Sequence, residues 1–244
     1  MHDNWSVGKG KNKVIMEFIE GFYMFSEEIN NLSDSNARIE IVEDIYNCIL
    51  KDDVNYATER LDKERLYGLF YVNKKNELIL YIKQTGIINE IGTIFHELVH
   101  LSDFIKLGKL IGNEDYRQLQ NNMFFILWSE FHADYISYRY LIEIGKNDIK
   151  PEQVSQKIKQ DLCTYYNSSP QLELQKTINT TVRSYGRYMA LQSHFPEELD
   201  KYLKGFFFNQ DFLNLYNFLW EHRSFESIKD CLDEVVQIFK NIEK

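Results

Sequence analysis

The chain has 244 residues, of which 44 % are hydrophobic, and it carries a net charge of −9. This is enough for one large or two small domains with a substantial core, which excludes a disordered or low-complexity protein. An acidic chain without a basic stripe repels phosphate backbones, so no nucleic-acid partner is expected.

The cysteines and the apolar runs predict a cytoplasmic protein. Cys48, Cys163 and Cys231 are odd in number, far apart and in no CxxC pair, which indicates a reducing compartment and argues against a cysteine zinc site. The N-terminal stretch MHDNWSVGKGKNK lacks the apolar segment of a signal peptide, and the longest apolar runs are too short to span a bilayer. No membrane partner is therefore expected, and the oligomeric state stays open.

The first part of the chain mixes helical and strand patterns. Apolar residues at helical spacing predict a helix from Val14 to about Asn30, and the alternation in residues 37–42, ARIEIV, predicts a short strand. Residues 44–50 fit either a helix or a strand. Two apolar runs around the turn NKKN predict a β-hairpin over Leu66–Ile82.

The following segments are predicted to be helices. One helix is expected over Asn89–Lys109, and a second one over Asp115–Ile144, which Gly145 ends. From Pro151 onward the chain is expected to be helical in pieces. The breaks between these pieces are predicted at Asn167–Pro170 and Phe195–Pro196.

Two histidines stand one helical turn apart in the first of these long helices. His96, Glu97 and His100 form the pattern HExxH within the apolar segment IFHELVHL. Positions i and i+4 share one face of a helix, so both imidazoles can reach the same ion. Glu97 is offset by about 100° and flanks that ion, where it can take a proton from a metal-bound water.

A catalytic zinc site needs a third protein ligand and an open fourth position. The metzincin continuation of HExxH would require a ligand where Lys106 stands, and a lysine ammonium is a poor ligand. Asp103 lies one turn after His100, but three ligands on one straight helix would strain the tetrahedron. We expect Asp103 to be a surface carboxylate or one that supports a ligand.

The segment WSEFHADY, residues 128–135, supplies a better third ligand. Glu130 and Asp134 share one face of an otherwise apolar helix, and buried carboxylates are costly unless they pair or bind an ion. Glu130 would complete a His, His, Glu set, while Asp134 could accept the free N–H of a zinc-bound histidine. His132 lies roughly 200° from Glu130 around the helix and is expected to be a core or surface histidine.

The sequence HELVH followed by EFHAD resembles the gluzincin metallopeptidases, whose pattern is HExxH followed by Glu-x-x-x-Asp on a downstream helix. The resemblance covers roughly residues 66–140 and leaves the subfamily and the substrate open. It implies that the zinc ligands are His96, His100 and Glu130. It also implies that Glu97 is the general base and that Asp134 is a supporting carboxylate.

The resemblance also implies how a substrate would bind. In such enzymes a strand edge beside the active-site helix holds the substrate as an extra strand, and either Leu66–Val72 or Glu77–Ile82 could serve. An ordinary core hairpin is at least as expected. A tyrosine or histidine after the third ligand stabilises the oxyanion in related enzymes. Here the candidates are Tyr185 and His194, each of which also fits a structural role.

Together these features predict an α+β fold with two parts. Residues 1–150 would form a zincin-like metallopeptidase domain with a small sheet and an active-site helix, and residues 151–244 a mostly helical part. The expected function is zinc-dependent hydrolysis of peptide bonds in a peptide or protein. Two alternatives stay open: a catalytically silent zinc-binding module that regulates or binds proteins, and a metal-dependent hydrolase that acts on something other than a peptide.

Overall fold

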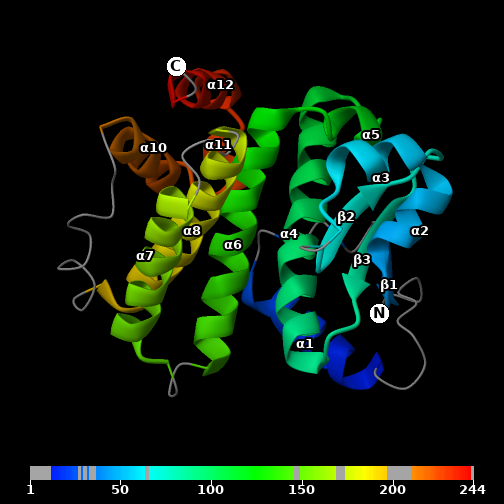
Figure 1. Ribbon diagram of the computed structural model, residues 1–244, viewed down its shortest axis with the longest axis horizontal. Helices are drawn as coiled ribbons and strands as arrows, with labels where there is room; N and C mark the ends of the chain where they lie inside the picture. Colours follow the sequence, from blue (N-terminus) through cyan, green and yellow to red (C-terminus); the bar gives the residue numbers. More distant parts are fainter. Residues whose placement is uncertain are drawn as a thin grey trace. The chain divides into compact units, whose positions relative to one another are not determined.

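The computed structural model describes residues 12–26, 29, 32, 37–63, 66–145, 149–168, 174–196 and 210–242. In these residues, helices predominate around a small three-stranded mixed sheet, which confirms the general α+β class (Figure 1). By packing, the chain divides into two compact units, Met1–Asn121 and Asn122–Lys244, and each is described by itself below. The boundary predicted after residue 150 falls later in the chain than this division.

Unit 1 contains the sheet. Its strands follow the order β1-β3-β2: β1 (Arg38–Val42) pairs in parallel with β3 (Leu78–Lys83), and β3 pairs antiparallel with β2 (Gly68–Val72). The predicted hairpin and the predicted strand over residues 37–42 are therefore confirmed. Inside the hairpin turn, the Asn73 side chain accepts hydrogen bonds from the backbone N–H groups of Lys75 and Glu77, both at 2.9 Å.

Five helices of the described part of unit 1 accompany the sheet: α1 (Asn12–Phe25), α2 (Ile45–Asp52), α3 (Val54–Arg60), α4 (Ile87–Ile111) and α5 (Tyr116–Leu119). The segment left open over residues 44–50 is helical because the Asp44 side chain accepts from the backbone N–H of Asn47 at 2.9 Å, which caps α2. The first helix ends at Phe25, before the predicted Asn30.

The helix α4 lies in the core of unit 1. It packs against β2, β3 and α1, and the rings of Phe22 and Phe95 lie 4.5 Å apart between α1 and α4. A helix that is apolar on nearly every side is buried on nearly every side, as the fully buried Phe95, Leu98 and Val99 illustrate. The predicted helix is thus confirmed, and Gly112, with φ of 66°, ends it in the left-handed conformation.

The described residues of unit 2 form helices and the turns that connect them. Its helices are α6 (Met123–Gly145), α7 (Pro151–Ser168), α8 (Leu174–His194), α10 (Gln210–Glu221), α11 (Phe225–Ile228) and α12 (Leu232–Ile242). The single helix predicted over Asp115–Ile144 is wrong, because the chain turns at Gln120–Asn122 and starts again. There the Asn122 side chain accepts from the backbone N–H of Phe125 at 3.1 Å and caps α6.

The pairing of α6 with α8 is the most extensive helix contact in unit 2 (Figure 1). Gly186 on α8 makes the close approach possible: a Cβ there would lie 2.5 Å from the backbone oxygen of Phe131 and 3.0 Å from the backbone nitrogen of Tyr135. Because α6 packs on α8 in this way, both helices belong to the same compact unit. Among the described helices, none has the length and hydrophobicity needed to cross a membrane.

Replacing Gly186 by alanine is expected to destabilise the protein, because the new methyl group would collide with backbone atoms that cannot rotate away. Overpacking of this kind lowers the free energy of unfolding by about 1–3 kcal/mol, against a gain in helix propensity of about 1 kcal/mol. Urea denaturation followed by circular dichroism measures the net loss. Gly145→Ala is the matched control, since its Cβ would meet only Ile149 at 3.7 Å. Equal stability of the two variants would contradict the close crossing.

Candidate metal centre

His96 and His100 face each other on α4. Their Nε2 atoms lie 3.0 Å apart, and their rings stand at 84° to one another with centroids 4.6 Å apart. Two nitrogens bound to one tetrahedral zinc ion are about 3.3 Å apart, given Zn–N bonds of about 2.0 Å. Both side chains are buried. The pair therefore already has nearly the spacing that a shared ion requires.

Glu97 lies beside the pair and is held by the sheet. It is 7 % exposed, and its Oε2 accepts a hydrogen bond from the backbone N–H of Phe70 in β2 at 2.7 Å. In the hairpin, Tyr67 bonds to Lys83 and Asn73 to Glu77 through their backbones. Hydrogen-bonded pairs alternate along an antiparallel ladder, so the N–H of Phe70 points away from β3. The carboxylate thus closes the outer edge of β2.

At Phe70, on the outer edge of β2, both the backbone N–H and the backbone carbonyl oxygen already have hydrogen-bond partners. While Glu97 accepts from the N–H of Phe70, the Nε2 of Gln120 donates to its carbonyl oxygen at 3.1 Å. The strand β3 lies between β1 and β2 and has no free edge. The expectation that a hairpin strand holds an extended substrate is therefore wrong for β3. For β2 it is wrong at Phe70, where two side chains already occupy the backbone groups.

Gly68 lets β2 approach α4 closely enough for this contact. A Cβ at Gly68 would lie 2.3 Å from Cγ2 of Thr93 and 2.8 Å from Oε1 of Glu97. Sequence reasoning did not single out this glycine, although a glycine inside a strand is a known sign of close backbone approach. Its position makes it part of the surroundings of Glu97.

In unit 2, the two predicted carboxylates of α6 lie against two arginines of α8. The Oδ2 of Asp134 is 2.9 Å from Nε of Arg183 and 3.2 Å from Nη2 of Arg187. Arg183 also lies 3.6 Å from Oε2 of Glu130. Carboxylates on this apolar helix were expected to need partners, and α8 supplies cationic ones. The role of Asp134 toward a histidine stays a prediction.

Other histidines and acids of the predicted site region have structural positions. His132 is fully buried and stacks on Trp128 with ring centroids 4.7 Å apart, which confirms it as a core histidine. Asp103 is also fully buried, so it is not the surface carboxylate that was one of its two expected roles.

The two candidates for oxyanion stabilisation, Tyr185 and His194, both lie on α8. Tyr185 is fully buried and packs edge-on against Tyr216 at 5.3 Å, so its ring is part of the core of unit 2. His194 lies with its Nε2 3.4 Å from Oε2 of Glu143, and Glu143 follows Glu130 along α6 by about 20 Å. Their role in stabilising an oxyanion stays a prediction.

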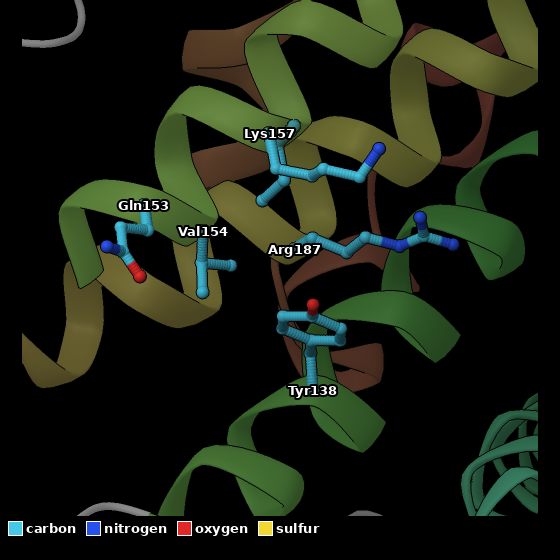
Figure 2. A pocket seen from close by; sticks show the side chains of 6 residues that line it. Tyr138, Gln153, Val154, Lys157 and Arg187 are labelled. Carbon is cyan, nitrogen blue, oxygen red and sulfur yellow. The ribbon is translucent and has the colours of Figure 1, made fainter. Parts of the chain in front are cut away.

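A pocket of about 360 Å³ opens among α6, α7 and α8 (Figure 2). Its lining includes the cationic side chains of Lys157 and Arg187 together with the hydroxyl-bearing Tyr138. Two cations and a hydroxyl donor favour an anionic group. Arg187 also pairs with Asp134, so the pocket and the α6 carboxylates share one side chain.

The three predicted ligands, His96 and His100 in unit 1 and Glu130 in unit 2, are a group of side-chain types that could hold a metal ion. The His, His, Glu combination is a known donor set of zinc sites that keep one position open, so the donors fit this ion. Within the part of the chain that the structure describes, His222, Cys231 and Glu234 form another such group. No family model matches this chain, and comparison with curated proteins and with solved structures found no match.

Proposed function

We propose that the protein is a zinc-dependent metallopeptidase that hydrolyses peptide bonds in a peptide or protein substrate. The observation that carries the proposal is the buried pair of His96 and His100, whose Nε2 atoms lie 3.0 Å apart, together with the buried Glu97 that follows His96 on the same helix. The order of these residues along the chain, HExxH and then Glu-x-x-x-Asp, supports the same chemistry. Helices α4 and α6 would each contribute ligands to one ion.

When bound, zinc would supply Lewis acidity toward the scissile carbonyl and lower the pKa of a coordinated water to about 7. Glu97 would act as the general base. Its Oε2 is fixed by the N–H of Phe70, which leaves Oε1 to accept the water proton and pass it to the leaving amine. Gly68 leaves the space that Oε1 needs.

The arginines of α8 would keep the third ligand in place. Arg183 contacts both Glu130 and Asp134, so rotation of the Glu130 carboxylate is restricted from one side. A ligand held in this way loses less conformational freedom when it binds an ion. Asp134 orients Arg183 in turn, and its burial makes the pair stronger than a surface ion pair.

A catalytically silent zinc module is the second candidate, and the closed edge of β2 is the observation that favours it. A peptidase that recognised its substrate by strand addition would leave this edge open, whereas Glu97 and Gln120 close it at Phe70. The loss or persistence of activity in the variants below separates the two functions. A panel of peptide and non-peptide esters and amides addresses a hydrolase with another substrate.

Glu97→Gln should keep the metal and lose hydrolysis. Glutamine preserves the size of the side chain and can still accept from Phe70, but it cannot take a proton from water. Loss of a general base lowers kcat by about 10²- to 10⁴-fold. Metal content is measured by mass spectrometry and turnover with a peptide library. Glu114→Gln, at an exposed glutamate, is the control. Full turnover by Glu97→Gln would refute the assigned base.

Glu130→Ala should reduce metal occupancy sharply, because one of three protein ligands is removed. Glu143→Ala is matched to it, since Glu143 is a glutamate on the same helix, with its side chain 48 % exposed. Equilibrium dialysis against zinc compares the two variants with the unaltered chain. Full occupancy in Glu130→Ala would mean that another residue is the third ligand.

Gly68→Ala should reduce turnover while metal binding persists, because the new methyl group displaces the Glu97 carboxylate. Thr93 would also be pushed aside, so the double variant Gly68→Ala/Thr93→Ser removes the closest clash. In the double variant, stability is expected to return toward that of the unaltered chain, whereas turnover should stay as low as in Gly68→Ala. If turnover recovers together with stability, the methyl group acts through Thr93 and not through Glu97.

A further inference from the structure

A mixed set of donor atoms lies where α10 and α12 come together in unit 2. His222 directly follows α10, Cys231 directly precedes α12, and Glu234 lies in the first turn of α12. One ligand atom from each residue lies within 4.8 Å of the other two. We propose that His222, Cys231 and Glu234 bind a divalent zinc-type ion, separately from the group that contains His96 and His100.

A hydrogen bond to the backbone determines which nitrogen of His222 is available to an ion. Its Nδ1 lies 2.9 Å from the carbonyl oxygen of Ser227, and a carbonyl only accepts, so Nδ1 carries the proton. The lone pair is then on Nε2, which is the arrangement that a backbone carbonyl imposes on histidine ligands. The ring also packs against Phe218, with centroids 4.5 Å apart. The orientation is therefore fixed before any ion binds.

The carbonyl that orients His222 is itself held in a defined turn. Ser224 and Ser227 form a capping box at the start of α11, in which each side chain bonds to the backbone N–H of the other residue. The indole N–H of Trp128 donates to the carbonyl oxygen of His222 at 2.9 Å. Both the backbone and the ring of His222 are thus supported by residues outside the ligand set.

The thiol and the carboxylate complete a negative site. Cys231 is a free, half-buried cysteine, and the acidic residue Asp230 directly precedes it in the chain. The nearby cation Lys229 is drawn to Glu226, with Nζ 2.5 Å from Oε2. A divalent cation would be attracted to this site and would favour the thiolate form of Cys231.

The donor types select the kind of ion. Thiolate and imidazole favour zinc and similar transition metals over magnesium or calcium, which prefer oxygen donors. One sulfur, one nitrogen and one carboxylate oxygen are compatible with tetrahedral zinc and leave a fourth position open. Sequence analysis did not find this set because it contains a single cysteine and lacks a CxxC spacing.

A bound ion would join the end of α10 to the start of α12. The helix α12 packs against α10 and α6, and the ring of Phe239 lies stacked 6.3 Å from that of Phe124. The ion would therefore stabilise the last helix of unit 2 on α6. This role needs no catalysis, so the inference stands apart from the proposed function.

Cobalt substitution tests the site through its sulfur ligand. Cobalt(II) bound to a thiolate has a charge-transfer band in the near ultraviolet that a His, His, Glu site cannot produce. We expect this band to saturate at one thiolate-bound cobalt per chain. It should disappear in Cys231→Ser, weaken in Glu234→Ala, and persist in Cys48→Ser, which removes the other described free thiol. Absence of the band, or its persistence in Cys231→Ser, would overturn the inference.

Two further measurements cover the case of a misfolded variant and separate this site from the proposed active site. In the unaltered chain, zinc should slow maleimide labelling of Cys231, and a chelator should restore it; unchanged labelling would contradict ligation. Metal analysis should give two ions per chain, and Cys231→Ser should lose one of them without losing any hydrolysis. His100→Ala should keep the thiolate band, whatever becomes of peptidase activity.

Discussion

The hydrogen bond between Glu97 and the backbone of Phe70 connects the helix that carries HExxH to the sheet. A charged side chain in the interior of unit 1 needs a donor, and the outward N–H of an edge strand needs an acceptor. Each group therefore satisfies the other. The same contact fixes the carboxylate beside the histidine pair and makes the small sheet part of the site, because the strand must approach the helix at Gly68.

This contact also limits what the edge of β2 can do. Strand addition needs free backbone groups on alternate residues, and Phe70 is the central outward residue of β2. An extended substrate that bound along β2 would have to be held at Phe70 by side chains instead of by a continuous backbone ladder.

Much of the local structure could be predicted from the sequence, because it depends on neighbouring residues. The helix with His96 and His100 follows from its apolar surroundings, and the hairpin follows from the two runs around NKKN. The turn at Asn122 was missed because a capping side chain leaves the apolar pattern on both sides unchanged. The Ile87–Ile111 helix offered no such ambiguity.

Partners that come from distant segments could not be predicted in the same way. Asp134 was predicted to support a zinc-bound histidine, and the sequence did not reveal that Arg183 and Arg187, which follow it after a whole intervening helix, lie against it. Their approach depends on Gly186, whose missing side chain lets α8 close on α6. Likewise, the sequence offered Tyr185 as a candidate for oxyanion stabilisation only because it is a tyrosine. In the structure its buried ring packs against that of Tyr216 on α10.

The two groups of candidate ligands differ in the cationic side chains that lie beside their acidic residues. In unit 2, Glu130 and Asp134 have arginines beside them, so part of their charge is balanced without an ion. In the second group, the ligand atoms of Cys231 and Glu234 lie within 4.8 Å of each other, and the neighbouring Lys229 pairs with Glu226. A bound cation would be attracted to the carboxylate and would favour the thiolate form of the cysteine. Because the role of this ion is structural, it is compatible with either proposed function of the histidine pair.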